Sequence, residues 1–324
     1  MSTDTTGPSA QPARPGLACS IGITTRNRPD SLVRCIASLG PFGDLVREII
    51  VVDDSSDVPI EPAFDRLAPA LRQKLVYISQ TGNLGYIVAR NAMMRRATSD
   101  YVLLLDDDTC VMDAAPLRAA LTLIDGSPKV AAVACAQAEA DGSPWPPSMQ
   151  PSPVSYACYV PTFIGFAHLL RRRVFLDLGG YRESFHFYGE EKDYCLRVLN
   201  ASYDVVYLPD ALVAHLPDPA GRSEARYLRY VIRNDCFCAL YNEPFPMPIL
   251  TVPMRLFRYV SMRRRGRVND PGGLRWVVAE LLRTMPRVLR DRTPMRWASL
   301  RRWRQLRRSW PAFEPQLPLT AVQP

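Results

Sequence analysis

Apolar runs of strand length alternate with segments of helical period between residues 19 and 136. The first run, "CSIGITT" over 19–25, leads into a segment in which Leu32, Val33, Ile36 and Leu39 share one helical face. The later runs are "EIIVVDD" (48–54), "KLVYIS" (74–79), "YVLLLDDD" (101–108) and "VAAVACA" (130–136). Helices are predicted between them near 61–72, 85–97 and 113–125. This alternation predicts an α/β fold, with a mostly parallel sheet and helices on both of its faces.

Three of the predicted strands end in polar clusters, "TTRN", "DDSSD" and "DDDT". Ligands of parallel sheets bind at the carboxyl ends of the strands. We therefore expect the three clusters to converge on one crevice.

The acidic triplet Asp106, Asp107 and Asp108 has two interpretations. Adjacent carboxylates at the end of a buried strand repel one another, so they form either a solvated turn or a site for a divalent cation. The chain contains neither GxGxxG after the first strand nor GxxxxGK[ST], which disfavours a dinucleotide-dependent dehydrogenase and a P-loop nucleotidase. A metal on the triplet would hold a phosphate instead, and Mg²⁺ and Mn²⁺ suit carboxylate sites of this kind.

Composition indicates a folded cytoplasmic protein. The eight cysteines include no CxxC pair, which favours reduced thiols over a disulfide or zinc framework. No apolar stretch reaches the ~18 to 20 residues of a membrane-spanning helix. The first residues, rich in Ser, Thr, Pro, Ala and Gly, show no signal peptide, and 1–17 is predicted to be a disordered tail.

Positive charge is concentrated near the C-terminus. Residues 251–310 contain 17 arginines and three acids, a net +14 in a chain whose total is +8. Here an apolar stripe recurs at helical spacing, with arginines between its members: Trp297, Leu300, Trp303, Leu306 and Trp310. Such a helix either lies in an anionic membrane surface or packs its Trp stripe on the rest of the protein. No recognised module supports nucleic-acid binding.

One long irregular segment, 140–156, interrupts the alternation. It is rich in Pro and Ser and is either disordered or a functional lid. Trp145 is its obvious contact residue, as a platform for a sugar or as an anchor of the lid.

Four separated motifs together resemble glycosyltransferase family 2, which has the GT-A fold. They are "IGITTRNRPDSL", "EIIVVDDSSD", "GNLGYIVARNAMMRRATSDYVLLLDDDT", and "GGYRESFHFYGEEKDYCLR" followed by "VAHL". They occur in the family's order and approximate spacing, across 19–216. The resemblance implies an inverting transfer of sugar from a nucleotide-sugar to a hydroxyl group.

The resemblance also implies site residues. The nucleotide-sugar would contact Thr24, Arg26, Asp53, Asn83, Gly85, Arg90, Asp106 and Asp107. Asp53 would hold the base, and Arg90 would lie beside the ribose and diphosphate. Asp108, Asp106 and His215 would bind Mn²⁺ or Mg²⁺, because His215 follows Glu191 by 24 residues, as a third ligand does in many members.

Glu190 and Glu191 occupy the acidic pair that includes the catalytic base. The family commonly has Asp as the second acid, so the longer Glu191 leaves Glu190 and Asp193 as alternatives for the base. Trp145, Gly165 and Asp193 are assigned to the acceptor side. Arg26 stands where a neutral or aromatic residue is frequent in the family.

The predicted organisation has a catalytic domain over 18–220 and a helical, Arg-rich region over 221–324. The catalytic domain would divide into a nucleotide-sugar half, about 18–136, and an acceptor half, about 137–220. We expect a UDP- or dTDP-sugar donor, a glycan or lipid-linked acceptor in bacterial glycan or glycolipid assembly, and a cytoplasmic enzyme peripheral to the membrane. The rival functions are a sugar-phosphate nucleotidyltransferase, which would need a Gly-rich stretch after the first strand, and a non-catalytic nucleotide-sugar-binding protein.

Overall fold

The computed structural model describes residues 16–217, 223–266 and 268–314. Most of the predicted N-terminal tail (1–17) therefore lies outside the described residues. The strands are β1 (Cys19–Thr25), β2 (Val46–Asp53), β3 (Leu75–Ser79), β4 (Tyr101–Asp106), β5 (Thr109–Val111), β6 (Val130–Ala138), β7 (Cys158–Tyr159), β8 (Ala167–Arg171) and β9 (Asp204–His215). The α-helices are α1 (Pro29–Ala37), α2 (Pro69–Arg72), α3 (Tyr86–Arg96), α4 (Ala114–Gly126), α5 (Arg172–Asp177), α6 (Glu190–Asn200), α7 (Glu224–Asn242), α8 (Met247–Arg264), α9 (Gly273–Arg290) and α10 (Trp297–Leu306).

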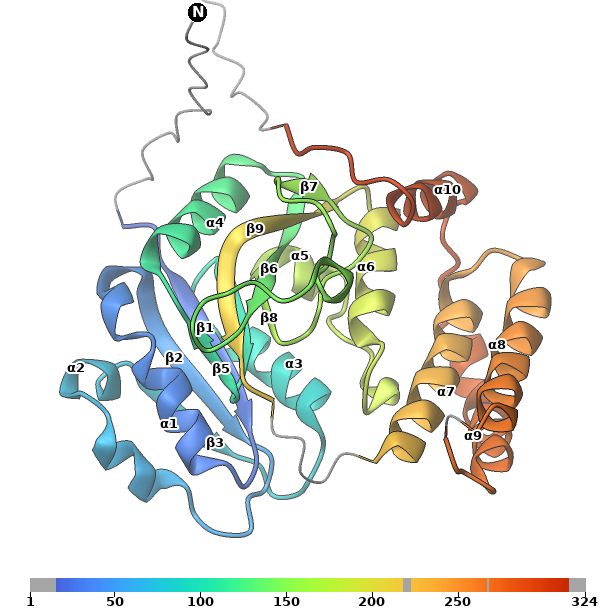
Figure 1. The fold of residues 1–324 in the computed structure, drawn as a ribbon, viewed down its shortest axis with the longest axis horizontal. Helices are drawn as coiled ribbons and strands as arrows, with labels where there is room; N and C mark the ends of the chain where they lie inside the picture. Colours follow the sequence, from blue (N-terminus) through green and yellow to red (C-terminus); the bar gives the residue numbers. More distant parts are fainter. Residues whose placement is uncertain (1–15, 218–222, 267, 315–324) are drawn as a thin grey trace, which may run out of the picture.

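One central sheet has the strand order β3-β2-β1-β4-β8-β6-β9-β5, with β7 paired to β9 (Figure 1). β1 to β4 pair in parallel, as predicted, and so do β6 and β9. β8 lies between β4 and β6 and is antiparallel to both. The predicted α/β class with helices on both faces is confirmed, and β8 makes the sheet mixed near its centre.

Alternating side chains of each buried strand pack into two hydrophobic cores, one on each face of the sheet. Leu103 and Leu105 of β4 join the core formed with α1 and α4, whereas Val102 and Leu104 join the core formed with α3 and α6. Because both faces are covered, these strands are nearly continuous runs of apolar residues, and such runs are the sequence pattern that predicted them.

Proline interrupts the helix predicted over 61–72. A short 3-10 helix, Glu61–Arg66, is followed by α2, which begins at Pro69. Ala68 has an extended ψ of 140°, as expected for a residue that precedes proline.

The irregular segment 140–156 folds back against β6. The Trp145 backbone N–H donates to the Gln137 carbonyl at 2.9 Å, and the Gln150 side chain donates to the same carbonyl at 2.8 Å. The segment is therefore an ordered cover of this end of the sheet, which agrees with the lid alternative and not with disorder.

The C-terminal helices share a core with the sheet. Phe237 of α7, Val277 of α9 and Trp303 of α10 belong to the same buried cluster as Val102 and Tyr194. Figure 1 shows α7, α8 and α9 grouped beside α6, on the opposite side of the molecule from β3. Among the described helices, none is long and apolar enough to cross a bilayer.

The Trp stripe of α10 mostly packs inward. Leu300, Trp303 and Leu306 are buried, and α10 contacts α6, where Lys192 Nζ lies 5.8 Å from the centre of the Trp303 ring. Arg302 adds an ion pair to Asp204 of β9. Of the two alternatives for this stripe, packing on the protein is the one observed.

Replacing Trp303 with Ala should lower the free energy of unfolding by about 3 kcal/mol, because the lost indole leaves a cavity against α6. Trp297 lies on the same helix but is 45% exposed, against 8% for Trp303, so Trp297→Ala is the matched control. It should change stability by less than about 0.5 kcal/mol. Urea unfolding measures both, and equal losses would contradict this packing of α10.

Candidate active site

The carboxyl ends of β1, β2 and β4 meet at one edge of the sheet. Register places Thr25 opposite Asp53 and Thr24 opposite Asp106. β5 then pairs with β9 so that Thr109 faces His215. The polar clusters therefore converge at one edge of the sheet, as predicted, although His215 follows the triplet by more than 100 residues in the sequence.

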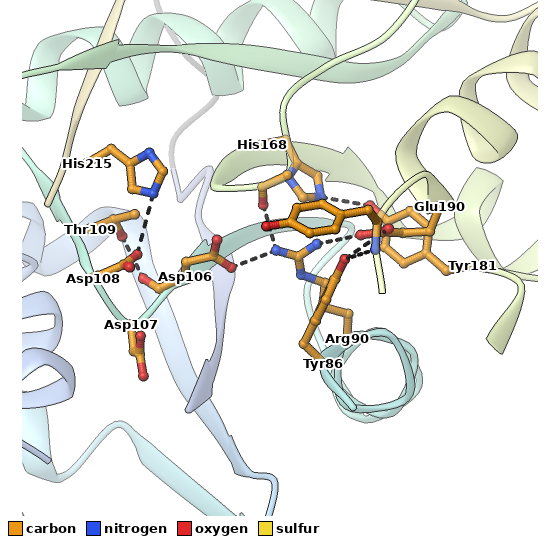
Figure 2. Close-up of polar contacts among 12 residues, drawn as sticks. Tyr86, Arg90, Asp106, Asp107, Asp108, Thr109, His168, Tyr181, Glu190 and His215 are labelled. Atoms are coloured by element: carbon orange, nitrogen blue, oxygen red, sulfur yellow. Dashed lines mark hydrogen bonds and ion pairs between the residues drawn. The ribbon is translucent and has the colours of Figure 1, made fainter. Parts of the chain in front are cut away.

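Three potential metal ligands lie together at this edge of the sheet. Ligand atoms of Asp106, Asp108 and His215 are all within 4.8 Å of one another. The His215 Nε2 faces Asp108 Oδ1 at 3.6 Å (Figure 2). Asp108 Oδ1 is buried and has no hydrogen-bond partner among the described residues. A buried carboxylate oxygen without a partner is costly, and one imidazole with two carboxylates suits Mn²⁺ or Mg²⁺. The residues present therefore fit a divalent cation.

The ring of His215 is oriented by three neighbours. Gln137 Oε1 lies 2.9 Å from Nδ1 and can only accept, so Nδ1 carries the proton and Nε2 is the nitrogen that faces Asp108. Gln137 is itself fixed, because its side-chain amide donates to the Met149 carbonyl. Trp145 and Phe166 stack on His215, with ring centroids at 5.5 and 5.1 Å. Trp145 is thus an anchor beside the metal ligands, and its place on the acceptor side stays a prediction.

Charge around the triplet is only partly balanced. Arg28 Nη1 lies 3.3 Å from both Asp107 Oδ1 and Asp108 Oδ2, and Thr25 donates to Asp107 at 2.8 Å. Burial nevertheless raises the pKa of Asp107 to about 7 and raises the pKa of Asp106 above its ordinary value. A cation held between these carboxylates would offset that cost.

Arg90 connects the triplet to the acidic pair (Figure 2). Its guanidinium binds Asp106 Oδ1 at 2.6 Å, Glu190 Oε1 at 3.1 Å and the Gly165 carbonyl at 2.7 Å. It also lies over the ring of Tyr86, 4.7 Å from the centroid. Burial opposes its charge, but Asp106 and Glu190 raise the pKa of Arg90 above the ordinary arginine value. The Arg90 side chain is 2% exposed and engaged with protein, and its predicted contact with ribose and diphosphate stays a prediction.

Glu190 and Glu191 differ in their surroundings. Glu190 is fully buried, and its carboxylate is held by Arg90 and by the Tyr86 hydroxyl at 3.1 Å. Glu191 is half-buried, and a methyl group added at Gly165 would collide with its Oε1. Burial raises the pKa of both carboxyl groups, that of Glu190 further. Glu191 is thus the member of the pair with access to a ligand, and it has that room because residue 165 is glycine.

Asp193 lies in a different environment. It is completely buried, where Arg182, Arg197 and Asn242 bind its carboxylate at 3.2, 2.8 and 2.7 Å. The hydrogen bond from Asn242 joins α6 to α7, and the ion pair with Arg182 joins α6 to the loop after α5. We therefore leave it out of the proposed site.

A second group of polar residues lies at the end of β2. The carboxylate of Asp53 accepts from Ser56 Oγ at 2.6 Å and from Tyr77 at 3.1 Å. Asp54 accepts from the backbone N–H groups of Leu84 and Gly85 at 2.7 and 2.9 Å. These bonds fix the loop that precedes α3.

The side chains of Asn83 and Arg26 close the mouth of this region. With its nitrogen facing Asp54 at 2.9 Å, the Asn83 amide presents its oxygen to Arg26 Nη1 at 2.7 Å. Gly85 has φ of +90°, which favours glycine, and its position faces the His186 carbonyl closely. The predicted group Arg26, Asp53, Asn83 and Gly85 is therefore brought together.

Several residues of the site did not stand out in the sequence. Arg28, Tyr86 and Gln137 each contact a predicted site residue through a bond that depends on the fold. Asp54 could have been suspected, since it is adjacent to Asp53 in the same polar cluster. The sequence does not show which of the two binds the loop before α3, because that depends on the direction in which each side chain points at the end of β2.

Comparisons with known proteins agree with this geometry. The "Pre-mycofactocin glycosyltransferase" of Mycobacterium tuberculosis (strain CDC 1551 / Oshkosh) is 31% identical over 214 residues, which cover 60% of this chain and 42% of the relative. The chain thus aligns with less than half the length of that relative.

Solved structures share the fold. The mannosyltransferase PcManGT from Pyrobaculum calidifontis, in complex with GDP-Man and Mn²⁺, superposes with a TM-score of 0.55 at 18% identity, over 83% of this chain and 75% of that one. S. aureus TarS 1–349 in complex with UDP-GlcNAc superposes with a TM-score of 0.53 at 16% identity, over 75% and 73%. Residues 20–188, about half of the chain, match the family described as "Glycosyl transferase family 2". The chain belongs to glycosyl transferase family 2.

Proposed function

We propose that this protein is a metal-dependent glycosyltransferase that moves a sugar from a nucleotide-diphosphate sugar to a hydroxyl group, with inversion at the anomeric carbon. The observation that carries the proposal is the pairing of two sites. A cation site formed by Asp106, Asp108 and His215 is joined through Arg90 to an acidic pair that includes the accessible Glu191. An inverting transfer needs both: positive charge for the leaving diphosphate and a base for the attacking hydroxyl.

The donor would lie across the carboxyl ends of β1, β2 and β4. Thr24, Arg26, Asp53, Asn83 and Gly85 line the side on which the nucleoside would bind. The two solved structures hold GDP-Man and UDP-GlcNAc, so the family fold accommodates more than one base. A UDP- or dTDP-sugar is our first expectation.

Asp108, Asp106 and His215 would hold Mn²⁺ or Mg²⁺ between them. A bound cation would supply Lewis-acid charge to the diphosphate as it leaves. Arg28, beside Asp107 and Asp108, would add a second positive group at the same place.

Glu191 would be the general base. Its half-buried carboxylate can accept a proton from an acceptor hydroxyl, whereas Glu190 is engaged by Arg90 and Tyr86. Glu190 would act as a positioning residue that fixes Arg90. The acceptor would approach from the half that follows residue 137, where Gly165 and Trp145 lie; a glycan or lipid-linked hydroxyl in bacterial surface assembly is the class we propose.

A thermal-shift titration with UDP, dTDP, GDP and CDP, each with and without Mn²⁺, tests the proposal. A ligand at about 100 times its Kd stabilises the folded state by about 2.7 kcal/mol. One nucleotide should raise the melting temperature of the wild type only when Mn²⁺ is present, and Asp108→Ala should abolish that shift. Asp177→Ala, an exposed acid on α5, is the control that should keep it.

If no nucleotide stabilises the wild type with Mn²⁺, the donor site is disproved. If a nucleotide and Mn²⁺ bind but no sugar is transferred or hydrolysed from any donor, the non-catalytic binding protein replaces the enzyme. Formation of a nucleotide-sugar from a sugar phosphate and a nucleoside triphosphate would favour the nucleotidyltransferase.

Gln137→Leu should weaken Mn²⁺ binding about tenfold, because His215 loses the acceptor that fixes its proton on Nδ1. Titration of Mn²⁺ by electron paramagnetic resonance, with and without UDP, measures the affinity directly. Gln150→Leu removes loop hydrogen bonds beside Gln137 but leaves the His215 contact, so it serves as the control. Equal affinities in Gln137→Leu and wild type would contradict this orientation of the ring.

Glu191→Gln should reduce kcat by about 10²- to 10⁴-fold while leaving the nucleotide-dependent thermal shift intact. A base must be deprotonated to act, so activity should rise with pH. Because burial raises the pKa of Glu191, that rise should lie above pH 4.5, the ordinary glutamate value. Glu190→Gln should keep the rising limb at a lower rate. If the rise of activity with pH is lost in Glu190→Gln and kept in Glu191→Gln, Glu190 is the base and Glu191 the positioning residue.

A further inference from the structure

The outer faces of α8 and α9 expose an unusual amount of apolar surface. Within the described parts of the chain, eight large apolar side chains are at least 60% exposed, and only Val58 lies elsewhere. The other seven lie on these two helices or the turn before α8: Phe245, Ile249, Leu250, Met254, Phe257, Leu282 and Leu289. We call them the outer apolar face. Large exposed apolar patches rimmed by polar residues mark protein or membrane interaction sites.

Contacts among α7, α8 and α9 show that α8 and α9 are antiparallel. α7 and α9 run in the same direction, since Arg229 of α7 binds Asp270 before α9 begins, and the Thr293 N–H donates to the Tyr241 carbonyl after it ends. α8 runs in the opposite direction, because only residues 243–246 separate it from the end of α7. The exposed start of α8 therefore lies at the same end of the helix group as Leu289, and both helices lie on the outer side of α7 (Figure 1).

Both helices carry large apolar residues on the outer side as well as on the side that packs in the core. α8 turns Val252, Leu256 and Tyr259 toward the core, and α9 likewise turns Val277, Leu281 and Val288 inward. The opposite side of each helix still carries large apolar residues, where a helix that faces only water has polar ones.

Arginine surrounds the outer apolar face. Residues 247–290 contain ten arginines and two acids, a net charge of +8. The exposed arginines include Arg258, Arg275, Arg283, Arg287 and Arg290. On α9 they alternate with Val278, Leu282 and Leu289, so apolar and cationic groups occupy one surface.

We propose that the outer apolar face of α8 and α9 binds an anionic membrane surface. Apolar side chains would enter the acyl boundary while the arginines contact lipid phosphates. A second copy of this face would bring two arginine-rich surfaces together, which is repulsive. Nucleic acid would satisfy the arginines but would leave the apolar side chains exposed. An anionic lipid surface satisfies both groups.

The membrane-facing elements would be α8 and α9 and not the α10 stripe, which is mostly buried against α6. This inference goes beyond the proposed chemistry and does not depend on it. If both hold, the enzyme would meet a lipid-linked acceptor at the bilayer.

Vesicle flotation of the full chain tests the proposal, with vesicles of phosphatidylcholine alone or with about 30% phosphatidylglycerol. Wild type should bind the anionic vesicles at least about tenfold more strongly than the neutral ones, and about 0.5 M salt should weaken that binding. The double variant Phe257→Glu/Leu282→Glu should lose about tenfold in binding, since each change places a carboxylate in the acyl boundary.

Val58→Glu is the matched control, because Val58 is equally exposed but lies in the loop after β2. It should bind anionic vesicles as the wild type does. Both variants should keep the nucleotide-dependent thermal shift, which separates a failure of this proposal from a failure of the donor site. The proposal is overturned if wild type does not bind anionic vesicles, if the double variant binds as well as wild type, or if the double variant instead dissociates a dimer that wild type forms without lipid.

Discussion

A single buried guanidinium organises this active site. Arg90 comes from the inner face of α3, yet it binds Asp106 at the end of β4, Glu190 at the start of α6 and the backbone before β8. A buried arginine is stable only when its charge and donors are matched, so these three segments must be in place together. The ion pairs of Arg90 with Asp106 and Glu190 therefore fix the position of the proposed cation site relative to the acidic pair.

The fold was largely predictable, because its main signal is local. Continuous apolar strands and helical periods place β1 to β4 and β6 within a few residues of their observed bounds. The direction of β8 was not predictable, since its five residues carry no signal that distinguishes a parallel strand from an antiparallel one. The split of the helix near 61–72 followed from proline at 69, a signal that was present but was outweighed by periodicity.

Candidate site residues could be predicted where they belong to sequence motifs. Residues that join the site through contacts with distant parts of the chain could not be predicted. The triplet, His215 and the acidic pair could be named from spacing within a recognisable family. Arg28, Tyr86 and Gln137 could not, because each acquires its role from a partner that is distant in the sequence. The carboxylate partners of Arg90 were not predicted for the same reason: a sequence gives the charge of a side chain but not the carboxylates that surround it.

The core shared by the sheet and the C-terminal helices restricts which substitutions these helices can accept. The family match ends at residue 188, but the core continues to Leu306. The inner sides of α7, α9 and α10 must therefore stay complementary to α6, and a graft of these helices from a relative would need the matching α6 surface. The outer sides carry no such requirement. Substitutions on these outer sides can therefore change what the helices bind without changing the residues at the end of β4.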